Sequence, residues 1–338
     1  MNGALARAYR ATGADLPRGD PARAHGVPFE GYYWRITHPR TGVVVVALGA
    51  ACAGPRGTWG LCTLALHPGD LVASAEGRNH FVRTVITPTA AADPQAFGMR
   101  AEGTLRGNAA GVSVDMGPDC RLDVSLDDRM VWPRRSFGAL GPAQAIPFLS
   151  QYWHPAVLAA AVRGRVRAGS TVLDLDGAMG YAEKNWGRGF PDHWWWGQAS
   201  AFGDDVSVSF AGGRLPLLGG EVAPTAVVVR LGRRVLALAP PAYRTRVVLG
   251  DGSWRLRTRG PTFALDVEGD AGGDDALELL VPVPEQERGE PRSRQHLAGV
   301  MSLRVRRGRR LVYRGESPLA GLERGAPVRS ASPAVPPG

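Results

Sequence analysis

The sequence predicts an all-β fold that consists of two tandem antiparallel β-barrels or sandwiches. Apolar or alternating runs of strand length recur along the chain, and Gly, Pro, Asp and Asn residues separate them. Long stretches of helical periodicity are nearly absent. A barrel of about eight to ten strands takes roughly 120 to 170 residues, so a chain of 338 residues fits two barrels in tandem.

The expected strands are either apolar runs, such as 43–48 (VVVVAL), or alternating ones, such as 122–126 (LDVSL) and 254–258 (WRLRT). Turn signals such as Asp251-Gly252 separate many of them. Residues 157–167 fit a helix or a strand that enters the next hairpin, and we adopt the strand. In order, the other expected strands are 32–37, 59–64, 79–86, 111–116, 171–175, 206–210, 226–231, 244–248 and 298–305.

Four segments make up the expected domain organisation. Residues 1–24 have two arginines near the start but no continuous apolar run, so we expect a flexible tail and not a secretory signal. A first barrel is expected over 25–165 and a second over 166–325, with the Pro- and aromatic-rich stretch 137–155 as the seam. The Pro- and Ser-rich residues 326–338 are expected to be disordered.

The formal charge of +9 does not indicate a nucleic-acid partner. Basic residues are scattered over the expected strands, and only 304–310 (RVRRGRR) forms a run. All of them are arginine except Lys184, the only lysine in the chain, which suggests a compositional bias. We expect no nucleic-acid binding, but weak attraction to an anionic membrane surface.

The cysteines and histidines predict a reduced protein without a metal site. Cys52, Cys62 and Cys120 are isolated, which fits small buried side chains in a cytoplasmic protein. No two histidines have the spacing of a metal-binding motif. No tract of about 18 apolar residues is present, so we expect a cytoplasmic protein with peripheral membrane contact at most.

Residues 181–199 (YAEKNWGRGFPDHWWWGQA) concentrate ionisable groups among tryptophans. In an extended strand, Tyr181, Glu183 and Asn185 share one face, and Lys184 and Trp186 lie on the other. After the turn, Trp194 and Trp196 share a face, with Trp195 opposite. The Gly and Pro residues between them form a turn that brings Asp192 and His193 near the opening of a barrel.

A resemblance to a known family begins at this segment. AEKNWGRGFPDHWWW, together with FEGYYWRITHP at residues 29–39, resembles the tocopherol cyclase family, whose members carry an EKNWGxGFP segment and an N-terminal FEGWY-type segment. The resemblance covers about residues 28–322, strongly at the two motifs. It implies two lipocalin-like domains related to carotenoid hydratases, and an activity that closes a prenylated benzoquinol to a chromanol without a redox cofactor.

Such a cyclisation requires a proton for the alkene, stabilisation of a tertiary cation, and a phenol held close to it. A carboxylic acid between apolar walls keeps its proton near neutral pH, and indole faces attract a cation. Glu183 is the candidate acid, although a structural salt bridge is the alternative. Asp192 and His193 are candidates for proton delivery or solvated loop residues. Lys184 either holds the quinol oxygen or pairs with Glu183.

The remaining candidates are expected to bind a lipophilic substrate. Asn185 either donates a hydrogen bond to the quinol oxygen or satisfies the turn. In the N-terminal motif, Glu30 and Arg35 point in opposite directions; the strand either closes the barrel or presents them to a cleft between the domains. The expected substrate-binding residues are Asn185, Trp186, Trp194, Trp196, Tyr181, Tyr33, Trp34 and Arg35. A carrier without catalysis and a hydratase that adds water to the alkene remain the alternatives.

Overall fold

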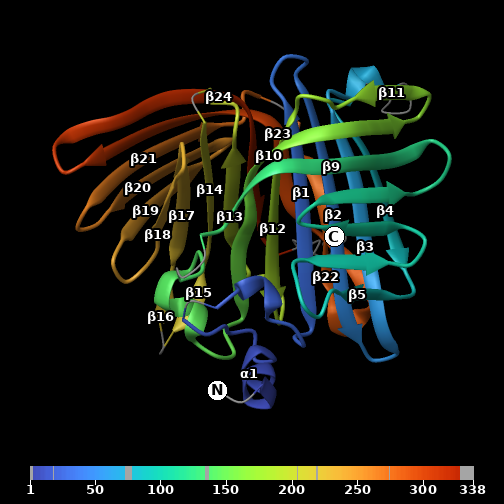
Figure 1. The fold of residues 1–338 in the computed structure, drawn as a ribbon, viewed down its shortest axis with the longest axis horizontal. Helices are drawn as coiled ribbons and strands as arrows, with labels where there is room; N and C mark the ends of the chain where they lie inside the picture. The colour runs from blue at the N-terminus through green and yellow to red at the C-terminus, as the bar shows by residue number, and fades with distance from the viewer. Residues whose placement is uncertain are drawn as a thin grey trace, which may run out of the picture.

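The computed structural model describes residues 3–17, 19–72, 78–133, 137–203, 205–217, 220–273 and 275–327. These residues form two large antiparallel sheets, one of 12 strands and one of 10, and a small two-stranded sheet (Figure 1). The first sheet is a nearly closed barrel and the second a half-barrel. The predicted all-β fold of two tandem lipocalin-like units is therefore confirmed.

The first sheet runs in the order β4-β3-β2-β1-β12-β10-β9-β8-β7-β6-β5, with β11 beside β10. Its far edge curls back, so that β5 and β6 approach β2, and its interior is filled by a core that includes Trp34, Leu64 and Val162. The strands are β1 Phe29–His38, β2 Val43–Gly54, β3 Gly57–His67, β4 Phe81–Thr87, β5 Ala90–Ala92, β6 Gly98–Ala101, β7 Leu105–Asn108, β8 Gly111–Asp115, β9 Cys120–Val131, β10 Gln151–Ala168, β11 Thr171–Asp174 and β12 Met179–Gly187.

The second sheet runs in the order β18-β17-β14-β13-β24-β23-β21-β20-β19, with β22 paired to the first half of the long strand β23. Trp254, Phe210 and Met301 belong to its core. Its strands are β13 Trp194–Ala199, β14 Val206–Gly213, β17 Thr225–Leu231, β18 Arg234–Leu238, β19 Arg244–Gly250, β20 Ser253–Arg259, β21 Phe263–Asp270, β22 Leu277–Val283, β23 Arg288–Arg307 and β24 Arg310–Gly325; β15 Leu215–Leu217 and β16 Gly220–Val222 form the small sheet.

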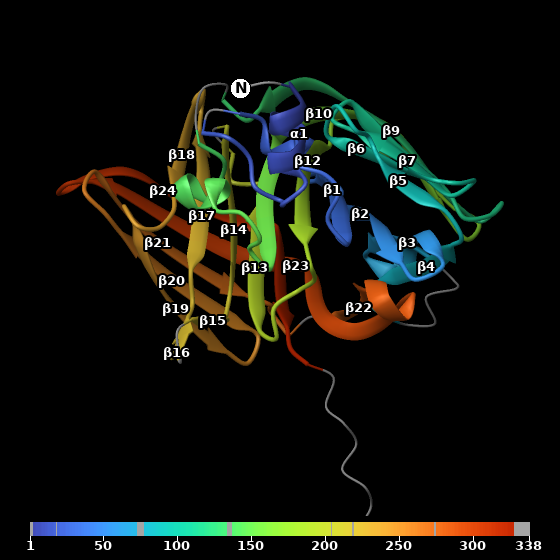
Figure 2. The ribbon, with the colours of Figure 1, turned by 90° about the horizontal axis from the view of Figure 1, so that it is seen from below.

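The two sheets meet along β1, β12 and β13 at the centre of the molecule (Figure 2). A core cluster with Tyr33 and Tyr181 from the first sheet and Trp196 and Leu279 from the second fills this seam. Arg35 is fully buried there, and its Nη2 donates to the carbonyls of Leu297 (2.6 Å) and Leu319 (2.7 Å). This arginine therefore ties β1 to the strands of the other sheet.

The boundary between the sheets differs from the expected one. The chain leaves the first sheet after β12 and enters the second at Trp194, whereas the expected boundary after residue 165 lies inside β10. Residues 157–167 lie in β10, so the strand interpretation of that segment is confirmed. Pro155 lacks an N–H for the ladder, and the pairing of β10 with β12 shifts register directly after it.

The described residues before 25 pack against the first barrel, although a flexible tail was expected. They include helix α1 (Gly3–Arg10) and the short helix η1 (Pro21–Arg23). Ala14 and Ala24 are fully buried, and Trp186 Nε1 donates to the carbonyl of Gly13 at 2.8 Å. The expected disordered tail 326–338 lies outside the described residues except for its first two positions. The other short helices in the described residues are η2 Gly69–Leu71, η4 Gly141–Ala145 and η5 Pro284–Gln286.

Candidate active site

A cavity of about 300 Å³ lies between the two sheets, and residues from both contribute to its wall. Its lining is mostly aromatic and aliphatic, with a few polar groups. The aromatic residues include Phe29, Tyr33, Tyr152, Trp153, Phe190, Trp194 and Trp196, and the polar ones include Gln151, Glu183, Asn185, Ser293 and Glu323. An apolar hollow with few polar groups is the usual form of a small-molecule site.

Alternation along β12 decides which side chains reach the cavity. β12 pairs with β1 so that Glu183 lies opposite Tyr33 and Asn185 opposite Gly31, and all four border the cavity. A Cβ atom on Gly31 would lie 2.2 Å from Asn185 Oδ1, so this glycine makes room for the amide. Asn185 Oδ1 is buried and accepts no hydrogen bond from the described residues. It is therefore a buried acceptor without a partner among the described residues.

Glu183 is the buried acid of this cavity. Its side chain is 3% exposed, and its Oε2 accepts hydrogen bonds from Tyr181 Oη (2.5 Å), Trp153 Nε1 (2.8 Å) and Trp196 Nε1 (2.9 Å). Burial raises the pKa of Glu183 to about 7, against the lowering effect of these three donors. The carboxyl is therefore protonated in a large fraction of molecules at neutral pH.

The tryptophans after the turn hold carboxyl groups as well as lining the cavity. Trp196 donates to Glu183, and Trp194 Nε1 donates to Glu323 Oε1 at 2.7 Å. Trp195 points the other way, into the core of the second sheet, and donates to Thr225 Oγ1 at 3.1 Å. The crowding of indoles and acids in this segment thus has a physical reason, because buried carboxyls need N–H partners.

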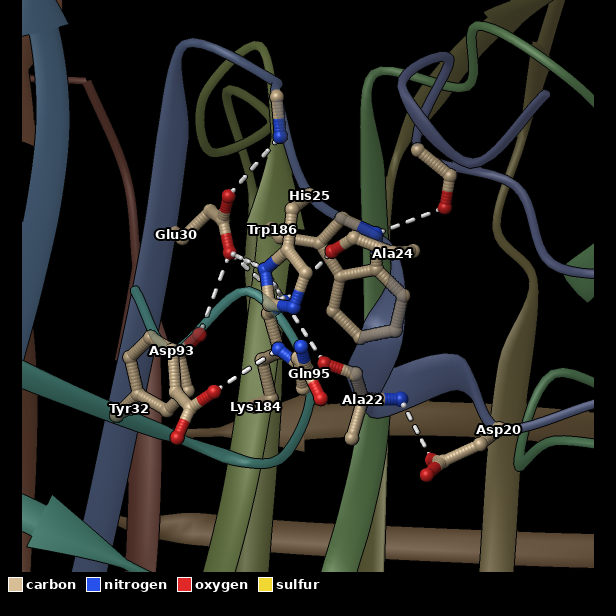
Figure 3. A network of polar contacts seen from close by, with 12 residues as sticks. Asp20, Ala22, Ala24, His25, Glu30, Tyr32, Asp93, Gln95, Lys184 and Trp186 are labelled. Carbon is tan, nitrogen blue, oxygen red and sulfur yellow. Dashed lines mark hydrogen bonds and ion pairs between the residues drawn. The ribbon is translucent and has the colours of Figure 1, made fainter. Parts of the chain in front are cut away.

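Lys184 lies on the opposite face of β12, inside the first barrel (Figure 3). Its side chain is 0% exposed, and its Nζ contacts Glu30 Oε2 at 2.8 Å and donates to the carbonyl of Ala24 at 2.6 Å. Burial would raise the pKa of Glu30, but Lys184 and His25 outweigh it and hold that pKa at about 2. The structure therefore brings Lys184 to Glu30 and neither to Glu183 nor to the cavity.

Several other predicted residues also lie away from the cavity. Asp192 and His193 are exposed in the turn between the sheets; the Asp192 side chain is 86% exposed and lies 3.9 Å from Arg292. Trp186 faces the first barrel and stacks on Tyr152 with ring centroids 5.5 Å apart. Trp34 lies in the barrel core, where its Nε1 donates to the carbonyl of Asn108.

The sequence-predicted residues thus separate into three groups. Glu183, Asn185, Trp194, Trp196 and Tyr33 border the cavity. Tyr181 lies directly behind Glu183 and positions it, and Arg35 lies in the seam. The rest lie in the barrel interior or in solvent. Glu323, which also borders the cavity, was not predicted, because nothing around it in the sequence marks it.

The fold and the site define a lipocalin-like protein of two sheets with a buried acid in an apolar cavity. The family described as Tocopherol cyclase-like matches residues 87–326, and the chain belongs to this family. The resemblance inferred from the two motifs is therefore confirmed.

Two plant proteins are among the relatives. The chain is 24% identical over 140 residues to "Tocopherol cyclase, chloroplastic" of Zea mays, and the matched region covers 40% of this chain and 30% of that protein. It is 26% identical over 133 residues to "Probable tocopherol cyclase, chloroplastic" of Oryza sativa subsp. japonica, covering 37% and 28%. The matches therefore span less than a third of the length of these relatives.

Two solved structures share the fold over most of their length. The structure of CghA with Sch210972 has a TM-score of 0.58 and 12% identity and covers 88% of both chains. Kievitone hydratase from Nectria haematococca has a TM-score of 0.52 and 11% identity and covers 88% of this chain and 89% of that one. At these identities the likeness concerns the fold alone.

Proposed function

We propose that the protein is a tocopherol cyclase-like enzyme that closes a prenylated benzoquinol to a chromanol, with Glu183 as the proton donor. The observation that carries this proposal is the buried carboxyl of Glu183, whose pKa burial raises to about 7, in an apolar cavity between aromatic rings. Family membership supports it, because the plant relatives are tocopherol cyclases by name.

The hydrogen-bond pattern of Glu183 suits proton donation. All three of its donors bind Oε2, so the proton of the neutral acid is on Oε1. When Oε1 gives this proton to the less substituted alkene carbon, the same three donors stabilise the carboxylate that forms. The donors thus act on the charged product of the step more strongly than on the neutral acid.

Aromatic rings around Glu183 can stabilise the tertiary cation that the cyclisation forms. Proton transfer to the alkene leaves a tertiary cation, and each ring face that meets it contributes about 0.5–2 kcal/mol. Trp153 and Trp196 donate to Glu183 and border the cavity, and Tyr33 packs edge-on against Trp196 at 5.1 Å. The phenol oxygen then attacks the cation and loses its proton, so substrate and product are isomers.

The size of the cavity limits what it encloses. A volume of about 300 Å³ is at the lower end for a ligand pocket, which is roughly 300–1,000 Å³. We infer that the quinol head and the nearest isoprene unit fill it, with the rest of the prenyl chain extending outward. A small, mostly apolar cavity also favours attack by the phenol over attack by water.

A membrane surface is the proposed source of such a substrate. Leu149 borders the cavity, and its neighbours Phe148 and Ile146 are 64% and 50% exposed. This loop rests on the end of α1, since Phe148 N donates to the carbonyl of Thr12, and α1 presents Leu5 at 60% exposure beside Arg7. Exposed apolar side chains next to a cation suit an anionic bilayer surface. None of the helices in the described residues is long and apolar enough to span a bilayer.

The test is incubation with a geranylated hydroquinone, followed by chromatography and mass spectrometry. A product of unchanged mass and shifted retention supports cyclisation. A gain of one water would replace the proposal with hydration, and bound but unaltered ligand would replace it with a carrier. Glu278→Gln is the matched control for replacement of Glu183 by Gln, because Glu278 is exposed on β22, a strand that borders the cavity.

A further inference from the structure

A second carboxyl group, that of Glu323, borders the same cavity from the opposite sheet. Glu323 lies on β24 directly across from Trp196 on β13 and from Gln295 on β23. Its Oε1 accepts from Trp194 Nε1 at 2.7 Å, and its Oε2 accepts from Gln295 Nε2 at 2.9 Å. The Gln295 amide oxygen Oε1 in turn accepts a long hydrogen bond of 3.5 Å from the hydroxyl of Tyr33.

The two carboxyls differ in how their donors are arranged. Glu183 receives its three donors on one oxygen, which leaves the other oxygen for a proton. Glu323 receives an N–H donor on each oxygen, which is the pattern of a carboxylate with its charge spread over both. The geometry thus matches an acid on the first sheet and a base on the second.

We propose that Glu323 is the second catalytic residue, which binds the phenolic hydroxyl of the substrate and takes its proton as the C–O bond forms. The inference rests on the proposed function, because it assigns the group that completes that reaction. It also narrows the class of possible substrates, since a base at this position requires a free hydroxyl on the aromatic head.

The proton balance closes over one turnover. Glu183 gives its proton to the alkene carbon, the phenol oxygen bonds to the resulting cation, and the phenolic proton passes to Glu323. The product is an isomer of the substrate, and one proton has moved from Glu183 to Glu323. Transfer of that proton back through water that enters the emptied cavity restores the starting state, so no co-reactant is needed.

The charges of the two carboxyls influence one another. Burial raises the pKa of Glu323 above its ordinary value even though Trp194, Ser293 and Gln295 oppose the shift, and negative charge on Glu323 raises the pKa of Glu183. Repulsion between two carboxylates disfavours the state in which both are ionised. Among the described residues, the side chains of Glu183 and Tyr33 face Glu323 across the seam, and the charge of Glu323 raises the pKa of both.

A binding experiment tests the inference without relying on turnover. Tryptophan fluorescence is titrated with a prenylated hydroquinone and with its dimethyl ether, which lacks the hydroxyl protons. We expect wild-type protein to prefer the free hydroquinone about tenfold, and Glu323→Gln to reduce this preference to below about threefold, because a neutral amide is a weaker acceptor than a carboxylate. An unchanged preference in Glu323→Gln would overturn the inference.

Kinetics then separate the inference from the proposed function. If the wild type cyclises its substrate, Glu323→Gln should lose about a hundredfold or more in kcat. Protonation of the base Glu323 should lower wild-type activity at acidic pH, and this fall should disappear in Glu323→Gln. Wild-type kcat in Glu323→Gln would remove Glu323 from the reaction and leave the cyclase proposal intact. Absence of product with the wild type would remove the cyclase proposal itself. Glu316→Gln, an exposed change on the same strand, controls for loss of charge on β24.

Discussion

At the scale of single residues, one expectation concerns Glu183. Replacement by Gln keeps the shape and the hydrogen-bond acceptor but removes the transferable proton. We expect kcat to fall by about a hundredfold or more, a typical loss for a general acid, with substrate affinity changed by less than about threefold. Single-turnover product analysis and fluorescence titration measure the two quantities. Wild-type turnover in this variant would exclude Glu183 as the donor.

A pH profile tests the same group from another direction. Because the active form carries the proton on Glu183, activity should fall as pH rises through about 7, the pKa of this carboxyl. Trp196→Phe removes one donor to the carboxylate form, so the pKa should rise further and the fall should move to higher pH. Trp195→Phe is a control, because Trp195 Nε1 donates to Thr225 and not to Glu183. A shift to lower pH in Trp196→Phe would contradict this account.

Sequence reasoning reached only part of the site. Glu183 and the face it shares with Asn185 follow from alternation within one strand, which is a local property. The partnership of Trp194 and Gln295 with Glu323 depends on which distant strands pair and in which register, and no pattern in the sequence fixes either. Lys184 was a candidate partner of Glu183 because the two residues are adjacent in the sequence. Strand pairing instead places Lys184 across from Tyr32.

At the scale of elements, the buried pair of Lys184 and Glu30 anchors the N-terminal segment, residues 3–17 and 19–25. Lys184→Met leaves the Glu30 carboxylate buried without its cation, and we expect a loss of about 3–5 kcal/mol in the free energy of unfolding. Adding Glu30→Gln should recover part of this loss. Urea denaturation measures both variants, with Arg121→Met at the exposed pair with Asp115 as a control. Equal stability of Lys184→Met and wild type would refute the anchoring role.

The turn that carries the chain from the first sheet to the second depends on Gly187. This residue has φ +148°, and a Cβ atom there would lie 2.2 Å from the carbonyl oxygen of Ser150. Gly189 has φ +159° but open space around it, so it controls for backbone conformation. We expect Gly187→Ala to lower the melting temperature clearly more than Gly189→Ala does. Equal shifts would mean that the close approach to Ser150 is relieved at little cost.

Elements with a strong sequence pattern were predicted best. The expected strands 32–37, 43–48 and 254–258 lie inside β1, β2 and β20. The short strands β5, β6 and β7 were not expected, because segments of three or four residues give no readable period. The boundary between the two sheets was expected too early in the sequence, because the long strand β10 continues through the expected boundary after residue 165.

At the scale of the whole molecule, the proposed membrane contact lies beside the cavity at the loop with Ile146 and Phe148. Phe148→Ser should reduce binding to vesicles that contain anionic lipid by about tenfold, because the lost apolar contact is worth roughly 1–2 kcal/mol. Val248→Ser is the matched control, since Val248 is 50% exposed on β19 in the second sheet. Co-sedimentation measures both. Equal binding of the two variants would place the contact elsewhere.

The burial of Lys184 also has a chemical consequence. It is the only lysine of the sequence, and its amine is enclosed by Glu30 and by backbone carbonyls of the segment that covers it. An acylating reagent can therefore reach a lysine in this chain only while that segment is lifted. The rate of acylation at this single position would measure how often the barrel uncovers its end, with no engineered label.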